Sequence, residues 1–389
     1  MEKTWRWFGK KDKITLDMLR QIGVEGIVTA LHEVPNGEIW TLDAIENLRD
    51  YIESYGLRWS VVESLPVCEA IKYAGPDRDR LIANYKISLA NLGKAGVKTV
   101  CYNFMPVIDW IRTDLYHPWP DGTSSLYFDM ARFAYFDLKI LCREGAESDY
   151  TKDVLDKVEE LDKVITDAEK DDLIDSIIVK TQGFVNGNIK EGDLNPVEIF
   201  RGLLKQYDGI TRDQLRENMR YFLAEIMPVC EEYGVNMCVH PDDPPFQVLG
   251  LPRIVTCEED IEWFLGAVDN PHNGLTFCTG SLGAGRFNDL VNISAKFAKR
   301  IYFAHLRQLK YINETDFYEN GHQTASGNID TYEIVKALVK NGFTGYVRPD
   351  HGRNVWGEDA KPGYGLFDRA MGATYLTGLF EAIQKDNEV

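Results

Sequence analysis

The chain has 389 residues, 44% of them hydrophobic, so it can bury a large core as one elaborated barrel or as two ordinary domains. Its 43 lysines and arginines stand against 61 acidic residues, and the net charge of -18 argues against nucleic acid and anionic membrane surfaces as partners. No run approaches the roughly 18 apolar residues of a membrane span, and the first residues lack the apolar stretch of a secretion signal, so we expect a cytoplasmic protein.

Glycines that end predicted helices mark the elements in chain order. Five times a helix-like pattern ends at a glycine that is followed within a few residues by a strand-like run, at Gly23, Gly56, Gly96, Gly234 and Gly342. Glycine suits the left-handed position that ends many helices because it has no Cβ atom to clash. Repeated units of helix followed by strand indicate a parallel sheet.

Eight candidate strands result when the runs at 5–8, 275–279 and 301–306 are added. They end near residues 8, 31, 63, 104, 240, 279, 306 and 350. Eight parallel strands with intervening helices predict a (β/α)8 TIM barrel, a single catalytic domain over residues 1–389 whose active site lies at the C-terminal strand ends. A doubly wound open sheet is the main alternative, but it would gather polar residues beside one glycine-rich turn, whereas here they follow many strands.

One connection, between the strands that end near residues 104 and 240, is far longer than the others and predicts an insertion over residues 105–210, after the fourth strand. It has an aromatic, β-rich start and continues into acidic helices between Glu144 and Asp175, where thirteen acidic residues oppose four lysines. We expect the acids to face water while one apolar stripe packs against the barrel or a second subunit. The stripe consists of Val154, Val158, Leu161, Ile165 and Ala168.

Four predicted strands end in a group that can bind a metal, namely His240, Cys278, His305 and Asp350. They are 38, 27 and 45 residues apart, about one βα unit each, so a barrel would bring them together at its mouth. Two imidazoles, a thiolate and a carboxylate suit manganese, iron(II) or zinc better than magnesium or calcium, which prefer all-oxygen shells. The alternative for each residue alone is a hydrogen-bonded packing histidine or a small buried cysteine.

Further candidates flank these four residues. His351 follows Asp350, and Tyr364 lies in the glycine-rich loop before the last helix. Both are candidate general acid and base groups, although Tyr364 could also serve packing alone. His322, in the long loop after the seventh strand, could reach the site.

A second set of residues lies at or near strand ends, where it could hold a carboxylate or hydroxyl groups. Its members are Arg6, His32, Glu63, Asn103 and Arg307. The two arginines suggest an acidic substrate, because a guanidinium binds a carboxylate through two parallel hydrogen bonds.

At these residues the chain resembles the mannonate dehydratases of hexuronate catabolism. The resemblance covers nearly the whole chain, the insertion included, and its motifs are long and specific. They include Thr4-Trp5-Arg6-Trp7, Trp59-Ser60-Val61-Val62-Glu63-Ser64, Cys101-Tyr102-Asn103-Phe104-Met105-Pro106-Val107, Val239-His240-Pro241-Asp242-Asp243-Pro244-Pro245, Cys278-Thr279-Gly280-Ser281 and Arg348-Pro349-Asp350-His351-Gly352.

This resemblance implies a xylose-isomerase-like barrel that converts D-mannonate to 2-keto-3-deoxy-D-gluconate and water, a hydro-lyase reaction. It also implies that the four candidate ligands hold Mn2+ or Fe2+, that His351 and Tyr364 do the acid-base work, and that the protein is a homodimer. The loop around His322 departs from the family's pattern in length and composition, so no role is carried onto that residue.

The residues suit this reaction, because loss of the C2 proton beside a carboxylate needs charge stabilisation and departure of the C3 hydroxyl needs a proton. The sequence leaves open which of His351 and Tyr364 is the base, which metal is bound, and whether other sugar acids react. Two alternatives are a divalent-metal sugar isomerase or epimerase on the same barrel and a metal-binding barrel without catalysis. Product analysis and a turnover assay with the sugar acid distinguish them.

Overall fold

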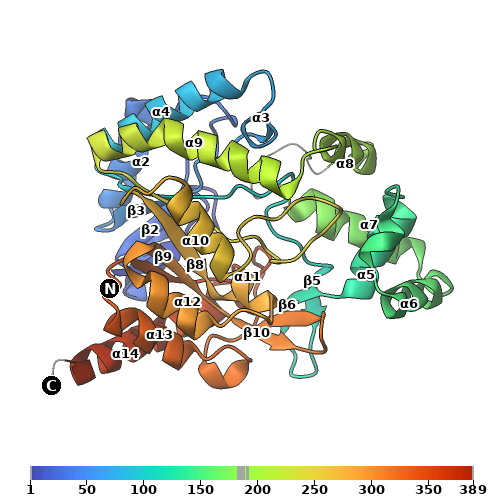
Figure 1. The fold of residues 1–389 in the computed structure, drawn as a ribbon. Coiled ribbons are helices and arrows are strands. Elements are labelled where there is room, and N and C mark those ends of the chain that lie inside the picture. The colour runs from blue at the N-terminus through green and yellow to red at the C-terminus, as the bar shows by residue number, and fades with distance from the viewer. Residues whose placement is uncertain (1, 182–188, 190–191, 388–389) are drawn as a thin grey trace.

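A computed structural model describes residues 2–181, 189 and 192–387, and a closed barrel of eight parallel strands lies at its centre (Figure 1). The order around the barrel is β1-β12-β9-β8-β7-β4-β3-β2, and β2 pairs with β1 to close it. The predicted TIM barrel is therefore confirmed, and the open-sheet alternative is wrong. The strands are β1 (Glu2–Arg6), β2 (Gly26–Thr29), β3 (Arg58–Glu63), β4 (Thr99–Tyr102), β7 (Asn236–Val239), β8 (Asn273–Cys278), β9 (Ile301–Leu306) and β12 (Tyr346–Pro349).

Helices connect the barrel strands and pack around them (Figure 1). They are α1 (Leu16–Gln21), α2 (Leu42–Glu53), α3 (Glu69–Lys72), α4 (Arg78–Lys94), α9 (Arg212–Tyr233), α10 (Glu258–Ala267), α11 (Thr279–Ala284), α12 (Leu290–Phe297), η4 (Ala298–Arg300), α13 (Thr331–Lys340) and α14 (Phe367–Asn387). Within the described ranges, no helix combines the length and the apolar character that crossing a membrane requires.

The helix-ending glycines have the predicted backbone conformation. All five have positive φ angles, from 65° at Gly234 to 84° at Gly96. The helix before β7 shows the consequence most clearly. The Thr211 hydroxyl accepts a hydrogen bond from the Gln214 backbone N–H at the start of α9, and Gly234 ends the helix in the left-handed conformation. The chain then enters β7 directly, which places His240 at the mouth of the barrel.

The predicted insertion contributes a β-hairpin and a group of helices beside the barrel (Figure 1). Its elements are β5 (Asp114–Pro118), β6 (Ser124–Phe128), α5 (Met130–Tyr135), η1 (Phe136–Ile140), η2 (Ala146–Asp149), α6 (Lys152–Asp162), α7 (Asp167–Ile174), η3 (Asp175–Lys180) and α8 (Pro196–Lys205). Residues 182–188 and 190–191 of the predicted insertion, and residues 1, 388 and 389 of the predicted domain, lie outside the described residues.

The acidic stretch does not carry one continuous apolar stripe. Val154 and Val158 are buried as predicted, but α6 ends at Asp162. Thr166 then starts α7 through a capping box with Glu169, in which each residue's side chain bonds the other's backbone. The new helix turns Ala168 to solvent, so the prediction for Ala168 is wrong.

A second, four-stranded antiparallel sheet lies outside the barrel, in the order β10-β11-β6-β5. Two of its strands, β10 (Gln308–Tyr311) and β11 (Phe317–Asn320), follow the seventh barrel strand, where the sequence suggested only a long loop; η5 (Thr324–Ser326) comes next. Phe317 pairs with Phe128 across the β11-β6 boundary, and their rings stack with centroids 5.3 Å apart. The insertion is therefore joined to the segment between β9 and β12.

Candidate active site

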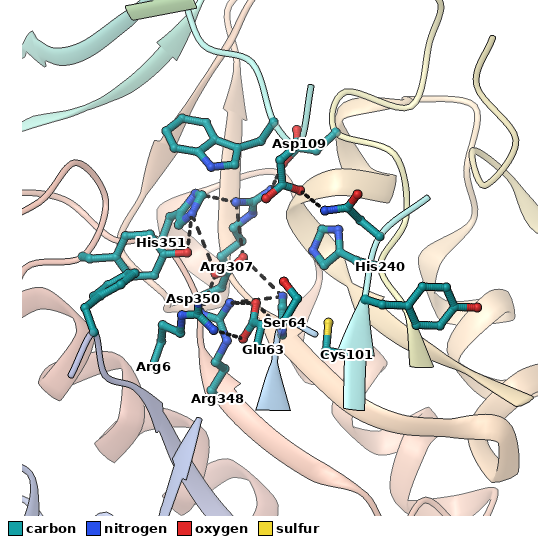
Figure 2. A pocket seen from close by; sticks show the side chains of 17 residues that line it. Arg6, Glu63, Ser64, Cys101, Asp109, His240, Arg307, Arg348, Asp350 and His351 are labelled. Atoms are coloured by element: carbon teal, nitrogen blue, oxygen red, sulfur yellow. Dashed lines mark hydrogen bonds and ion pairs between the residues drawn. The ribbon is translucent and has the colours of Figure 1, made fainter. Parts of the chain in front are cut away.

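A cavity lies at the C-terminal ends of the barrel strands, the end at which barrel enzymes carry their active sites (Figure 2). Its predicted lining residues come from six strands, β1, β3, β4, β7, β9 and β12, or from the segments that follow them. They are Arg6, Glu63, Asn103, His240, His305, Arg307, Asp350, His351 and Tyr364. Residues far apart in the sequence thus meet in one place.

Three predicted residues are not in this lining, namely Cys278, His32 and His322. Cys278 is wholly buried at the end of β8. His32 is exposed and lies beyond the end of β2, with its ring centroid 6.2 Å from that of Phe8, which does line the cavity. His322 is buried against α14, where its ring is close to Gly372, and it is not a lining residue. The structure therefore brings neither histidine into contact with the cavity.

The four candidate metal ligands converge. One donor atom each from His240, Cys278 and His305 lie within 4.8 Å of one another. The Asp350 Oδ2 atom is 3.6 Å from Cys278 Sγ and 3.9 Å from His305 Nδ1. These four groups are more than a hundred positions apart in the sequence from first to last, yet they surround one small volume.

Hydrogen bonds orient two of these ligands. His240 Nδ1 donates to the Pro241 carbonyl at 2.8 Å, so Nε2 is the nitrogen that can bind a cation. Cys278 is the N-cap residue of α11, and its sulfur accepts hydrogen bonds from the Ser281 backbone N–H at 3.4 Å and from the Ser281 hydroxyl at 3.1 Å. Such donors favour a thiolate, which is the form of cysteine that binds metals.

The other two ligands have suitable protonation states. Burial lowers the pKa of His305, and nearby Arg348 lowers it further, so its imidazole is neutral. Among the described residues, the buried His305 Nε2 atom has no hydrogen-bond partner. Burial alone would raise the pKa of Asp350, but Arg348 and the other positive groups around it lower the pKa, so the carboxylate is ionised. This orphaned nitrogen and the mixed donor set fit a manganese, iron(II) or zinc ion.

A second group of donor atoms, from Glu63, Cys101 and His305, also lies within 4.8 Å. The sequence did not single out Cys101 as a ligand, although it begins one of the quoted motifs; in the structure it lies in β4 and lines the cavity. Here Arg348 Nη2 is 3.0 Å from Glu63 Oε1 and 3.4 Å from His305 Nδ1. The group with His240 and Cys278 is the better cation site, because it offers two imidazoles, a thiol whose sulfur accepts hydrogen bonds from Ser281, and the nearby Asp350 carboxylate.

His351 and Tyr364 form a hydrogen-bonded pair at the cavity wall. His351 Nε2 is 3.1 Å from the Tyr364 hydroxyl, and the ring centroids are 4.8 Å apart. Phe8 packs edge-on against Tyr364, at 4.9 Å between centroids. Burial raises the pKa of Tyr364, so its hydroxyl keeps its proton near neutral pH. The pair can move protons between a bound molecule and the protein.

A buried network of charges, not foreseen from the sequence, surrounds this pair. Arg307, which was predicted to contact a substrate, lines the cavity. Its guanidinium is 2.5 Å from Asp243 Oδ2, 3.3 Å from Glu319 Oε1 and 3.2 Å from Asp350 Oδ2. Arg112 joins Asp243 and Glu319 from the other side. Asp243 could have been found from the sequence, because it lies in one of the quoted motifs. No sequence motif pointed to Glu319 or Arg112.

Arg6 has the geometry expected of an anion-binding residue. Its guanidinium is buried and lies 3.7 Å from Glu63 Oε2. Among the described residues, no hydrogen-bond partner is found for Arg6 Nη1. Figure 2 shows Arg6, Glu63 and Arg348 together on one side of the cavity. A carboxylate bound there would satisfy the unused donor.

The chain is similar to known proteins over its whole length. The family model for D-mannonate dehydratase (UxuA) matches residues 1–389. A mannonate dehydratase of Thermotoga petrophila is 44% identical over 99% of this chain and 98% of its own, and one of Chromohalobacter salexigens is 44% identical over 99% of both. The crystal structure of mannonate dehydratase from Streptococcus suis serotype 2 superposes with a TM-score of 0.80 at 38% identity, covering 100% of this chain and 96% of that one. With this full-length match and the converging ligands, the chain belongs to the D-mannonate dehydratase family.

Proposed function

We propose that this protein is a hydro-lyase that dehydrates D-mannonate to 2-keto-3-deoxy-D-gluconate. Family membership supports the reaction. The observation that carries it is the His351–Tyr364 pair, 3.1 Å apart, on the wall of the cavity that His240 and His305 also line. A proton-transfer pair beside a cation site is the equipment that removal of a proton next to a carboxylate requires.

We propose that His240, Cys278, His305 and Asp350 hold Mn2+ or Fe2+. A divalent ion, when bound, supplies Lewis-acid stabilisation of the negative charge that develops on the substrate carboxylate. Arg6 binds that carboxylate through its unused Nη1 donor and orients C2 toward the His351–Tyr364 pair. Most residues that line the cavity are buried, which limits the access of water to the reacting atoms.

The reaction needs two proton transfers, and His351 and Tyr364 carry out one each. One of His351 and Tyr364 takes the proton from C2, and the other gives a proton to the C3 hydroxyl, which leaves as water. The C2–H and C3–O bonds break and a C2–C3 double bond forms, so the first product is an enol. That enol takes up a proton at C3, loses the proton of its C2 hydroxyl, and becomes the 2-keto acid.

The test is product analysis of D-mannonate turnover in D2O by carbon and proton NMR, with enzyme reloaded with Mn2+ or Fe2+. Dehydration removes the C3 oxygen and leaves a deuterated methylene carbon at C3. An isomerase or epimerase would keep every oxygen on the carbon chain. Unchanged substrate, from folded and metal-loaded protein, would contradict both catalytic readings and leave a metal-binding barrel.

The homodimer and the cytoplasmic location are further parts of this proposal. The ring centroids of Trp356 and Phe367 are 5.4 Å apart on the surface, and their side chains are 76% and 40% exposed. Such an aromatic pair suits burial by a second copy. The cysteines of the described residues are all free, which suits a reducing compartment. Sedimentation equilibrium and cell fractionation test the two statements separately.

Arg6→Met is expected to raise KM for D-mannonate by roughly 10- to 100-fold, with a smaller change in kcat. The reason is the loss of a charge-assisted hydrogen bond to the substrate carboxylate. Steady-state kinetics check this, with Arg58→Met as the matched control because Arg58 is 62% exposed and pairs with Glu2 at the opposite end of the barrel. Equal KM values for the two variants would remove Arg6 from substrate binding.

A further inference from the structure

We propose that Glu319 is a positioning residue for His351, and that the four-stranded sheet outside the barrel delivers it to the active site. This inference rests on the proposed function, since it concerns how the acid-base pair of that reaction is held. Glu319 belongs to β11, which pairs with β10 and with β6 of the insertion.

The His351 ring is held from both sides. Glu319 Oε1 is 3.0 Å from His351 Nδ1, while His351 Nε2 is 3.1 Å from the Tyr364 hydroxyl. The carboxylate therefore sets the ring plane, and the ring plane sets where Nε2 meets Tyr364. Arg307 Nη1 lies 2.5 Å from the same Nδ1 atom. A guanidinium only donates and a carboxylate only accepts, so Nδ1 has a partner in either of its tautomers.

The position of Glu319 is itself fixed by opposite charges. Arg112 Nη2 donates to Glu319 Oε1 at 2.8 Å and Arg112 Nη1 donates to Asp243 Oδ1 at 2.9 Å, and both Glu319 and Arg112 are wholly buried. Burial alone would raise the pKa of Glu319, but Arg307, His351 and Arg112 together lower it, so the carboxylate is ionised. A buried carboxylate with this many donors has little freedom to move.

The outer sheet has a clear part in this arrangement. Arg112 lies two residues before the hairpin of β5 and β6, and its guanidinium lies over the Phe317 ring of β11 at 5.0 Å. Two segments from different parts of the chain thus contribute one charged residue each to the same network. Glu319 reaches His351 from this outer sheet, in which β11 pairs with both β10 and β6, and not from a barrel strand.

The kinetic test compares Glu319→Gln and Glu319→Asp in metal-reloaded enzyme with D-mannonate. We expect Glu319→Gln to lower kcat by about 100-fold with KM within about 2-fold, and Glu319→Asp to recover part of the loss, as for other residues that orient a catalytic or metal-bound histidine. Glu314→Gln is the matched control, because Glu314 is 92% exposed in the turn between β10 and β11. Unchanged kcat in Glu319→Gln would overturn the proposal.

A double-mutant cycle separates positioning from a general structural role. If Glu319 acts through His351, adding Glu319→Gln to His351→Ala costs no further activity. An additive loss in the double variant would overturn the proposal. Should Glu319→Gln fail to fold, Glu319→Asp takes its place in the cycle, and thermal unfolding shows which variants remain folded.

A spectroscopic readout does not depend on turnover. In histidine-labelled protein, the 15N shift of His351 Nδ1 is expected to change in Glu319→Gln and to stay constant in Glu314→Gln; the His351→Ala spectrum assigns the signal. If the wild-type protein does not dehydrate D-mannonate, the proposed function fails while this contact is still measured. An Nδ1 shift that is the same in both glutamine variants would contradict the inference itself.

Discussion

His351→Ala is expected to lower kcat for dehydration of D-mannonate by about 100- to 10,000-fold, because it removes one of the two groups that we propose transfer protons. Tyr364→Phe removes the other hydrogen-bonding atom while keeping the ring that packs on Phe8, and is expected to have an effect of the same order. KM should change little in both variants, because neither residue supplies the main charge that holds the carboxylate. Steady-state kinetics with quantified 2-keto-3-deoxy acid measure both parameters.

Controls for these substitutions lie elsewhere in the barrel. Tyr221→Phe deletes a surface hydroxyl that donates to Asp79 at 3.1 Å. His272→Ala changes a histidine at the N-terminal end of the barrel, where its Nδ1 lies 2.8 Å from Asn236 Oδ1. Both controls should keep kcat near the wild-type value. Full activity in His351→Ala and in Tyr364→Phe would show that this pair does not carry the chemistry.

Sequence reasoning located the barrel because its signals are local. A helix that ends at a glycine and the apolar run that follows it can both be recognised in a short segment of sequence. Gly234, which stands just before β7, is one such case. The four candidate ligands could be found in the same way, since each is one polar group at the end of an apolar run. Parallel pairing then brings strand ends together, as in the register of Cys278 with His305.

The limits of this reasoning follow from distance along the chain and from the exact end of each strand. His32 was chosen for its nearness to a strand end, but β2 ends at Thr29, and the turn that follows carries His32 to the surface. Glu319 and Arg112 gave no signal, because their burial depends on β11 pairing with a strand far earlier in the sequence. In a short segment where apolar and polar residues alternate, a glutamate is predicted to face solvent unless the strand pairing is known.

Arg348 shows a signal that could have been used. It lies inside the apolar run of β12, is 1% exposed, and its guanidinium contacts Glu63 at 3.0 Å and Asp350 at 2.7 Å. A charge in the middle of a buried strand needs a partner of opposite sign, because an unpaired buried charge is very costly. That requirement alone would have predicted carboxylates beside the strand end, and with them one wall of the cavity.

Removal of the metal with chelator is expected to abolish dehydration, and Mn2+ or Fe2+ is expected to restore it while Mg2+ is not, because the donor set contains nitrogen and sulfur. Cys278→Ser is the sharper form of this prediction. A serine hydroxyl stays neutral where a thiolate carries charge, so Mn2+ affinity should fall by at least about 100-fold, and activity should fall with it.

Metal content after dialysis and titration calorimetry with Mn2+ measure the effect of Cys278→Ser directly. Cys142→Ser is the matched control, because Cys142 is exposed in the insertion, where its thiol donates to the Lys139 carbonyl at 3.4 Å. The Ser281 backbone N–H and hydroxyl that now bond the thiol would bond a serine oxygen instead, so the fold at the start of α11 should survive. A folded Cys278→Ser protein that binds one Mn2+ with wild-type affinity would therefore move the cation site to another set of donors, of which Glu63, Cys101 and His305 are the nearest.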